Sequence, residues 1–163
     1  MNRTWVAILL GSLSLVGCAS APKGGAIAIP KVVPYAEGVG SPAIRKECVW
    51  NSELTGYIAA NAKRGTVVIV KDLSAATGKV LTMTITNVHA IPGGRVSGPK
   101  WGTLDGELRN DGRLIGSFKA SRNTTSGGFG ACANLDRVGE ALGKDIALWL
   151  KAPIMDARLG DEK

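Results

Sequence analysis

The spacing of hydrophobic residues predicts a half-buried strand in the middle of the chain. In the segment 79–91, "KVLTMTITNVHAI", the apolar residues Leu81, Met83 and Ile85 alternate with threonines. Because successive side chains of a strand point to opposite faces of the sheet, this alternation places the apolar side chains in a core and the threonines towards solvent.

A second pattern predicts an amphipathic helix near the C-terminus, over residues 132–153. Six apolar residues recur there at helical spacing and share one face: Leu135, Val138, Leu142, Ile146, Trp149 and Leu150. Pro153 cannot continue a helix, so we expect the helix to stop there. Residues 154–163, "IMDARLGDEK", are expected to form a loose charged tail.

An earlier helix is predicted over residues 41–63. Ser41 can accept a hydrogen bond as the N-cap, and Pro42 suits the first helical position. The apolar stripe drifts along the segment and Gly56 weakens its interior, so we expect a break or a bend. The β-branched run that follows, "TVVIVKD" at residues 66–72, is expected to be a buried strand.

Two further segments complete the predicted sheet. Residues 103–122 are predicted to form a hairpin that turns at Asn110-Asp111-Gly112, because Asp-Gly readily adopts the positive φ angles of a tight turn. The segment Ile27–Tyr35 could be part of a tether or an edge strand, since its two prolines are tolerated at a sheet edge.

The order of these elements indicates an α+β fold in a single layered domain. Half-buried strands need one apolar cover, so we expect a mostly antiparallel sheet of four to five strands with two helices on one face. The length of 163 residues is sufficient for one hydrophobic core.

The N-terminus changes the picture, because it has the layout of a secretory signal: Arg3, an apolar run, and then small residues. Leu15-Val16-Gly17-Cys18 resembles the lipobox of bacterial lipoproteins. The resemblance implies that residues 1–17 are removed and that Cys18 carries the lipid. Ala19, in place of the aspartate that retains members of this class at the inner membrane, implies the periplasmic face of the outer membrane. An ordinary cleaved signal with an incidental cysteine is the alternative.

These considerations divide the chain into a signal peptide (1–17), a lipidated tether with a possible edge strand (18–40), a globular domain (41–153) and a tail (154–163). If Cys18 is lipidated, two cysteines remain. Cys48 and Cys132 can then form a disulfide in an oxidising compartment. In the loop-entropy model, closing the loop between them would stabilise the folded protein by roughly 4 to 5 kcal/mol. The alternative is two separate buried thiols. Two distant cysteines and a single histidine fall short of a zinc site, and no metal or cofactor is expected.

The formal net charge is +7, but the basic residues are scattered along the chain. No run resembles a nucleic-acid-binding arm, so we expect no nucleic-acid partner. In the envelope such a surface could meet an envelope protein, peptidoglycan or lipopolysaccharide, or it could simply be solvated.

The best candidates for a binding site are Arg95, Lys100 and Trp101, in a glycine-rich loop between predicted strands. Loops on a rigid sheet often carry binding residues, although Trp101 could instead begin a strand and pack in the core. The glycines of the segment 124–132 could hold an anion before the last helix, but they match no phosphate-binding motif, which favours a flexible connection.

His89 is the only histidine and could serve a cell-wall or lipid-surface hydrolase, but no catalytic motif surrounds it. A structural histidine at a strand end is the simpler interpretation. Over Ile27–Pro153 the order of elements is similar to that of small envelope lipoproteins such as peptidoglycan-synthase activators, the curli-secretion lipoprotein and the TolB amino-terminal domain. That similarity implies a non-enzymatic accessory role in the envelope and transfers no functional residues.

Overall fold

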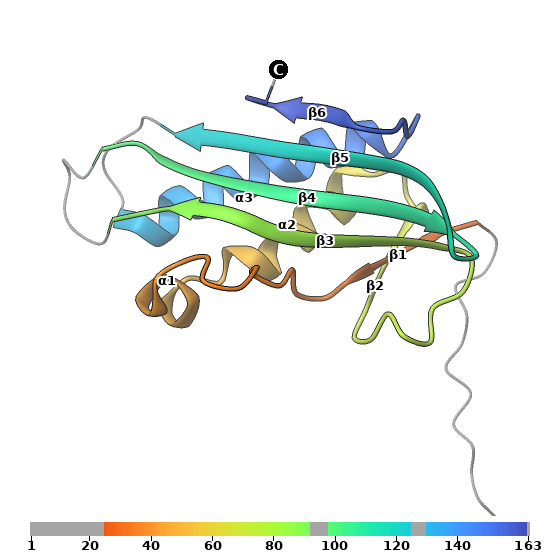
Figure 1. The fold of residues 1–163 in the computed structure, drawn as a ribbon, viewed down its shortest axis with the longest axis horizontal. Helices are drawn as coiled ribbons and strands as arrows, with labels where there is room; N and C mark the ends of the chain where they lie inside the picture. Colours follow the sequence, from red (N-terminus) through yellow and green to blue (C-terminus); the bar gives the residue numbers. More distant parts are fainter. Residues whose placement is uncertain (1–24, 92–97, 125–129, 163) are drawn as a thin grey trace, which may run out of the picture.

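The computed structural model describes residues 25–91, 98–124 and 130–162. The lipobox with Cys18, the candidate Arg95 and residues 125–129 of the glycine-rich segment lie outside these ranges. The described residues form one six-stranded sheet and three helices (Figure 1). In chain order the elements are β1 (Ile27–Pro30), α1 (Pro42–Glu47), α2 (Trp50–Asn61), β2 (Val67–Val70), β3 (Lys79–His89), β4 (Lys100–Asn110), β5 (Arg113–Thr124), α3 (Gly130–Trp149) and β6 (Ala157–Gly160).

The α+β class with helices on one face of the sheet is confirmed. The strand order is β2-β1-β3-β4-β5-β6, in which β3, β4 and β5 are antiparallel neighbours. Helices α2 and α3 pack against each other behind the sheet (Figure 1). The sheet has six strands rather than four to five, because residues 157–160, expected to belong to a loose tail, form β6, which pairs in parallel with β5.

The hydrophobic core lies between the sheet and the two longer helices. Leu81, Met83 and Ile85 of β3 are buried there, as the alternation predicts. All six residues of the predicted α3 stripe are buried as well. The helix spans Gly130–Trp149 and thus ends four residues before Pro153.

The N-terminal helical segment is broken as expected. Ser41 Oγ accepts a hydrogen bond from Ile44 N and caps α1, which has Pro42 at its start. Cys48 adopts an extended conformation that ends α1, and α2 begins two residues later. The predicted hairpin is also present: Asp111 and Gly112 join β4 to β5 with φ angles of 48° and 82°.

Three expectations about the ends of the sheet are wrong. β1 is not an edge strand, since it lies between β2 and β3 and Pro30 is its last residue. β2 is the edge instead, and none of its four residues is buried, since Val68 and Ile69 are exposed. Residues 157–160 form β6 on the other edge rather than part of a loose tail, because their backbone continues the sheet beyond β5.

Candidate binding face on the open side of the sheet

The sheet face away from the helices is covered by none of the described elements, and it is densely polar. Because side chains alternate along each strand, the residues next to the core positions point to this second face. We call it the open face, and it is formed by Thr82, Thr84, Asn87 and His89 of β3, Trp101, Thr103, Asp105, Glu107 and Arg109 of β4, Ser117, Lys119, Ser121 and Asn123 of β5, and Arg158 of β6.

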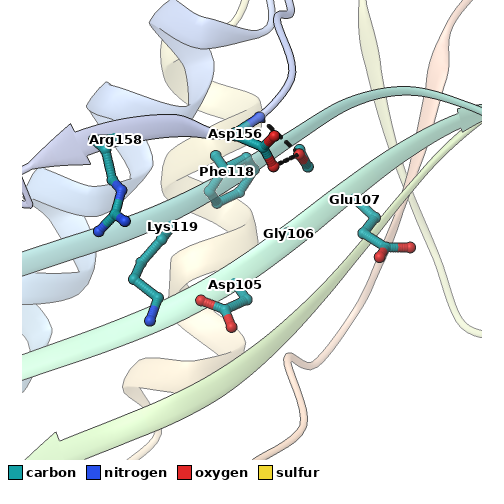
Figure 2. Close-up of a pocket in the computed structure, with 8 residues that line it drawn as sticks. Asp105, Gly106, Glu107, Phe118, Lys119, Asp156 and Arg158 are labelled. Carbon is teal, nitrogen blue, oxygen red and sulfur yellow. Dashed lines mark hydrogen bonds between the residues drawn. The ribbon is translucent and has the colours of Figure 1, made fainter.

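The open face carries a shallow hollow of about 350 Å³ over strands β4, β5 and β6 (Figure 2). Its charged lining contains carboxylates of Asp105, Glu107 and Asp156, and cations of Lys119 and Arg158. A second hollow of about 350 Å³ lies over β3 and β4 and shares the segment 105–107 with the first. The two hollows therefore meet along the centre of β4.

Charges of both signs lie side by side on this face. Asp105 lies directly opposite Lys119 in the β4–β5 register. Arg109 Nη2 lies 2.8 Å from Glu107 Oε2, but both side chains are about half-exposed, so this ion pair contributes little to stability. Such exposed charges remain accessible to a partner.

Asp156 is fixed at the rim of the hollow by two hydrogen bonds with Ser117 of β5. Ser117 Oγ donates to Asp156 Oδ1 at 3.0 Å, and Asp156 N donates to Ser117 Oγ at 2.8 Å. These bonds hold the start of β6 against β5 (Figure 2). No pattern in the sequence marks Asp156 or Arg158 as site residues, because the segment around them is too short and irregular to predict a strand.

At one end of the open face, the rings of His89 and Trp101 are stacked. Their centroids are 3.9 Å apart and their planes differ by 11°. A β-bulge between Ile85 and Asn87 makes this contact possible, because it shifts the register so that His89 pairs with Trp101 and points to the open face. His89 thus lies on the open face in contact with Trp101.

The candidates Lys100 and Trp101 do not form one surface. They are consecutive residues of β4 and therefore point to opposite faces of the sheet. Lys100 is only 2% exposed, and its Nζ donates to the carbonyl oxygen of Gly98 at 2.8 Å. The structure thus removes Lys100 from the predicted surface, whereas Trp101, half-buried, stays on the open face.

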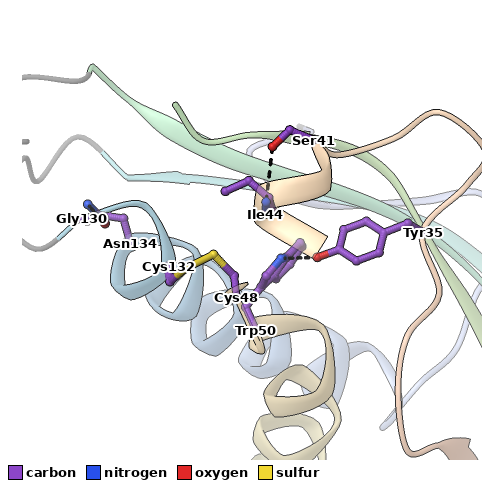
Figure 3. The surroundings of a disulfide bond; sticks show 8 residues. All are labelled: Tyr35, Ser41, Ile44, Cys48, Trp50, Gly130, Cys132 and Asn134. Carbon is purple, nitrogen blue, oxygen red and sulfur yellow. Dashed lines mark hydrogen bonds between the residues drawn. A yellow bond between two sulfur atoms is a disulfide. The ribbon is translucent and has the colours of Figure 1, made fainter. Parts of the chain in front are cut away.

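The predicted disulfide is present and lies on the opposite, helical side of the molecule. Cys48 and Cys132 are bonded, and they join the α1–α2 junction to the first turn of α3 (Figure 3). Beside them, Trp50 Nε1 donates to Tyr35 Oη at 2.8 Å. This arrangement fixes the helical layer on which the sheet rests.

The described part of the chain holds no group of three His, Cys, Asp or Glu side chains arranged as metal ligands. Among its helices none has the length and apolar character needed to cross a membrane. What the open face offers is a rigid array of hydroxyl, amide and charged groups, which suits the recognition of a polar partner.

Comparison with known protein families finds no match, and no curated protein matches the sequence. Solved structures share the fold. An uncharacterised protein matches with a TM-score of 0.52 and 13% identity over 78% of this chain and 91% of that one. A PelC dodecamer from Paraburkholderia phytofirmans matches with a TM-score of 0.50 and 16% identity over 77% and 86%.

A third solved protein, from Xanthomonas campestris and of the family DUF330, has a TM-score of 0.49 and 12% identity over 81% of this chain and 87% of that one. At these identities the first two likenesses define the class of fold, an α+β domain found in bacterial proteins, and nothing finer. Neither is described as an enzyme.

Proposed function

We propose that this chain is a lipid-anchored accessory protein of the bacterial outer membrane, and that its open face binds another envelope protein on the periplasmic side. The lipobox supports the anchor, since Cys18 follows Leu15-Val16-Gly17 at the end of an apolar signal. The single observation that carries the binding role is the open face, a polar sheet surface with two adjoining hollows.

The charges of the open face favour a protein over an anionic polymer. A lipopolysaccharide or peptidoglycan strand presents mainly negative charge, which Asp105, Glu107 and Asp156 would repel. A protein surface with both signs of charge can complement these carboxylates and also Lys119 and Arg158. Complementary charges of this kind set specificity and the rate of association.

The anchor can be tested by replacing Cys18. We expect the wild-type protein to fractionate with the outer membrane and to carry acyl chains in intact-mass measurements. The variant Cys18→Ser should lose the acyl mass, because the lipid is attached to that thiol. If acylation and membrane fractionation were the same in both proteins, the anchor would be wrong.

The binding face can be tested by photocrosslinking in cells. A photoreactive residue at Ser117, in the hollow, should capture a discrete protein, whereas one at Leu148, exposed on the far side of α3, should not. The double charge reversal Lys119→Glu with Arg158→Glu should remove the crosslink from Ser117. An identical set of products from both positions, or a crosslinked polysaccharide in place of a protein, would contradict the proposal.

A further inference from the structure

Strand β2 forms one edge of the sheet, and no described strand pairs with its outer side. Among the described elements it contacts β1 and α2, and its other side has no neighbouring strand. Thr66 O accepts from Ile27 N at 2.7 Å, and Val70 O accepts from Lys31 N at 2.9 Å. Because these groups alternate along a strand, the backbone N–H and C=O groups of Val67 and Ile69 point away from β1 and are available for pairing.

The side chains of this edge do not discourage association. Natural sheets protect an edge with a very short strand, proline, inward-pointing charges or a bulge. The run Val67–Val70 is short, with four residues, but it contains no proline, charge or bulge. Val68 is 38% exposed and Ile69 is 40% exposed. An exposed, apolar edge strand of this kind is a template for a further strand.

We propose that a second copy of this chain pairs with β2 in antiparallel fashion, about a twofold axis at Val68. The free groups of Val67 and Ile69 restrict the register, because only residues with outward backbone groups can exchange hydrogen bonds. When Val67 of one copy pairs with Ile69 of the other, the outward N–H and C=O groups of both residues form hydrogen bonds in both copies. Val68 of one copy then lies opposite Val68 of the other. The resulting contact is isologous, as a twofold dimer requires.

The charges that flank the strand agree with this register. Arg64 and Asp72 each lie four residues from Val68, so the axis brings Arg64 of one copy to Asp72 of the other, twice. Both residues are exposed, and they flank β2 on opposite sides. Arg64 lies in the turn before the strand, next to Gly65 with its φ of 79°, so the contact would be made by the long arginine side chain and not by a continued ladder.

The carboxylate of Asp72 is held in place by two hydrogen bonds. Ser74 N donates to its Oδ1 at 2.8 Å, and Ser74 Oγ donates to its Oδ2 at 2.7 Å. These hydrogen bonds fix the carboxylate in place, and they lower the pKa of Asp72, so that it is ionised at neutral pH. Each carboxylate oxygen retains a lone pair for an arginine.

The ladder in this register is confined to residues 66–70 of each copy, which makes a small interface, so the dimer should be weak in dilute solution. Confinement to a membrane surface would raise the effective concentration of the two edges and favour pairing. The pairing itself does not depend on the open face, which is formed by strands β3 to β6.

The test is a disulfide at the axis. In the proposed register two cysteines introduced by Val68→Cys would face each other at a non-hydrogen-bonded position, where Cα atoms are about 4.5 Å apart and can be bridged. The full chain in its own membrane should therefore form a covalent dimer on oxidation. The control Val49→Cys, exposed on the helical side, should stay monomeric.

Charge exchange then tests the register. In the Val68→Cys background, Arg64→Asp should lower the dimer yield several-fold, and the added Asp72→Arg should restore it. A yield from Val68→Cys no higher than from Val49→Cys would overturn the dimer. Stronger crosslinking through Ile69→Cys, capture of a different protein at Val68, or failure of the exchange to restore the yield would equally overturn the proposed pairing.

Discussion

Cys48 and Cys132 are separated by 84 residues in the sequence, yet their Cα atoms lie 5.0 Å apart and their sulfurs are bonded. The bond ties the break between α1 and α2 to the first turn of α3, next to the buried side chain of Trp50 (Figure 3). The loop that it closes therefore contains α2 and the strands β2 to β5.

Removal of this bond should destabilise the domain. We expect the double variant Cys48→Ala with Cys132→Ala to lose about 2–4 kcal/mol of unfolding free energy, because the unfolded chain regains the entropy of an open loop. Urea unfolding followed by circular dichroism measures the change. Dithiothreitol should lower the urea midpoint of the wild type and leave the urea midpoint of the variant unchanged. Equal midpoints for the wild type and the variant without reductant would refute the stabilising role of the disulfide.

Much of the layered arrangement could be predicted because its signals are local. The alternation of β3, the apolar stripe of α3 and the Asp111-Gly112 turn each depend on residues that are close in sequence. The pairing of Cys48 with Cys132 followed from the compartment and the parity of the cysteines, not from geometry.

The edges of the sheet could not be predicted, because they depend on which strands meet. The run at 67–70 is as apolar as a central strand, but its parallel pairing with β1 leaves it at the edge. β6 has only four residues and is held by side chains from β5. The sequence could not predict that His89 lies on the open face, because the β-bulge before it reverses the alternation that β3 otherwise follows.

The glycine at the centre of β4 is predicted to be irreplaceable. A Cβ atom at Gly106 would overlap the ring of Phe118, which is buried on the facing strand. Gly106→Ala should therefore cost about 1–3 kcal/mol of unfolding free energy, since the core must shift to admit the methyl group.

Gly56 is the matched control in the same assay. It lies on the exposed side of α2, and a Cβ atom there would meet nothing within 4 Å. Because glycine is unfavourable inside a helix, Gly56→Ala should instead stabilise the protein by about 0.5–1 kcal/mol. A change of the same sign for both substitutions would contradict the packing seen around Gly106.

Tyr57 on α2 links the two long helices and should titrate unusually late. Its hydroxyl donates to Asp136 Oδ1 at 2.9 Å. Burial, this hydrogen bond and the nearby negative charges raise the pKa of Tyr57 from 10.0 to about 12. The folded state thus favours the protonated phenol, so its contribution to stability is complete below about pH 10 and is lost as the pH rises towards 12.

Alkaline titration of phenolate absorbance measures this shift in the folded protein. Asp136→Ala should move the late transition towards the ordinary tyrosine range, and Tyr57→Phe should abolish it. The remaining transition belongs to Tyr35, whose pKa is raised mainly by burial. The assignment fails if the latest transition persists in Tyr57→Phe.

Asp161 fastens the last strand to the sheet. Its carboxylate accepts from Arg122 Nη1 at 3.1 Å, from Asn123 N at 2.9 Å and from Asn123 Nδ2 at 2.7 Å. Arg122 also donates to both carboxylate oxygens of Asp145 on α3, at 2.7 and 2.9 Å. Asp161→Ala would therefore free the end of β6 while Arg122 keeps its bidentate partner.

We expect this substitution to loosen β6 locally rather than to unfold the domain, because strands with few buried contacts open independently. In hydrogen exchange followed by mass spectrometry, the peptide 154–163 should lose protection while peptides of β3 and β4 stay unchanged. Glu162→Ala is the matched control, since its ion pair with the exposed Arg158 is worth little. Equal loss of protection in the two variants would show that the hydrogen bonds of the Asp161 side chain do not hold the strand. The backbone pairing with β5 alone would then keep β6, with Arg158 and the neighbouring Asp156, at the rim of the open face.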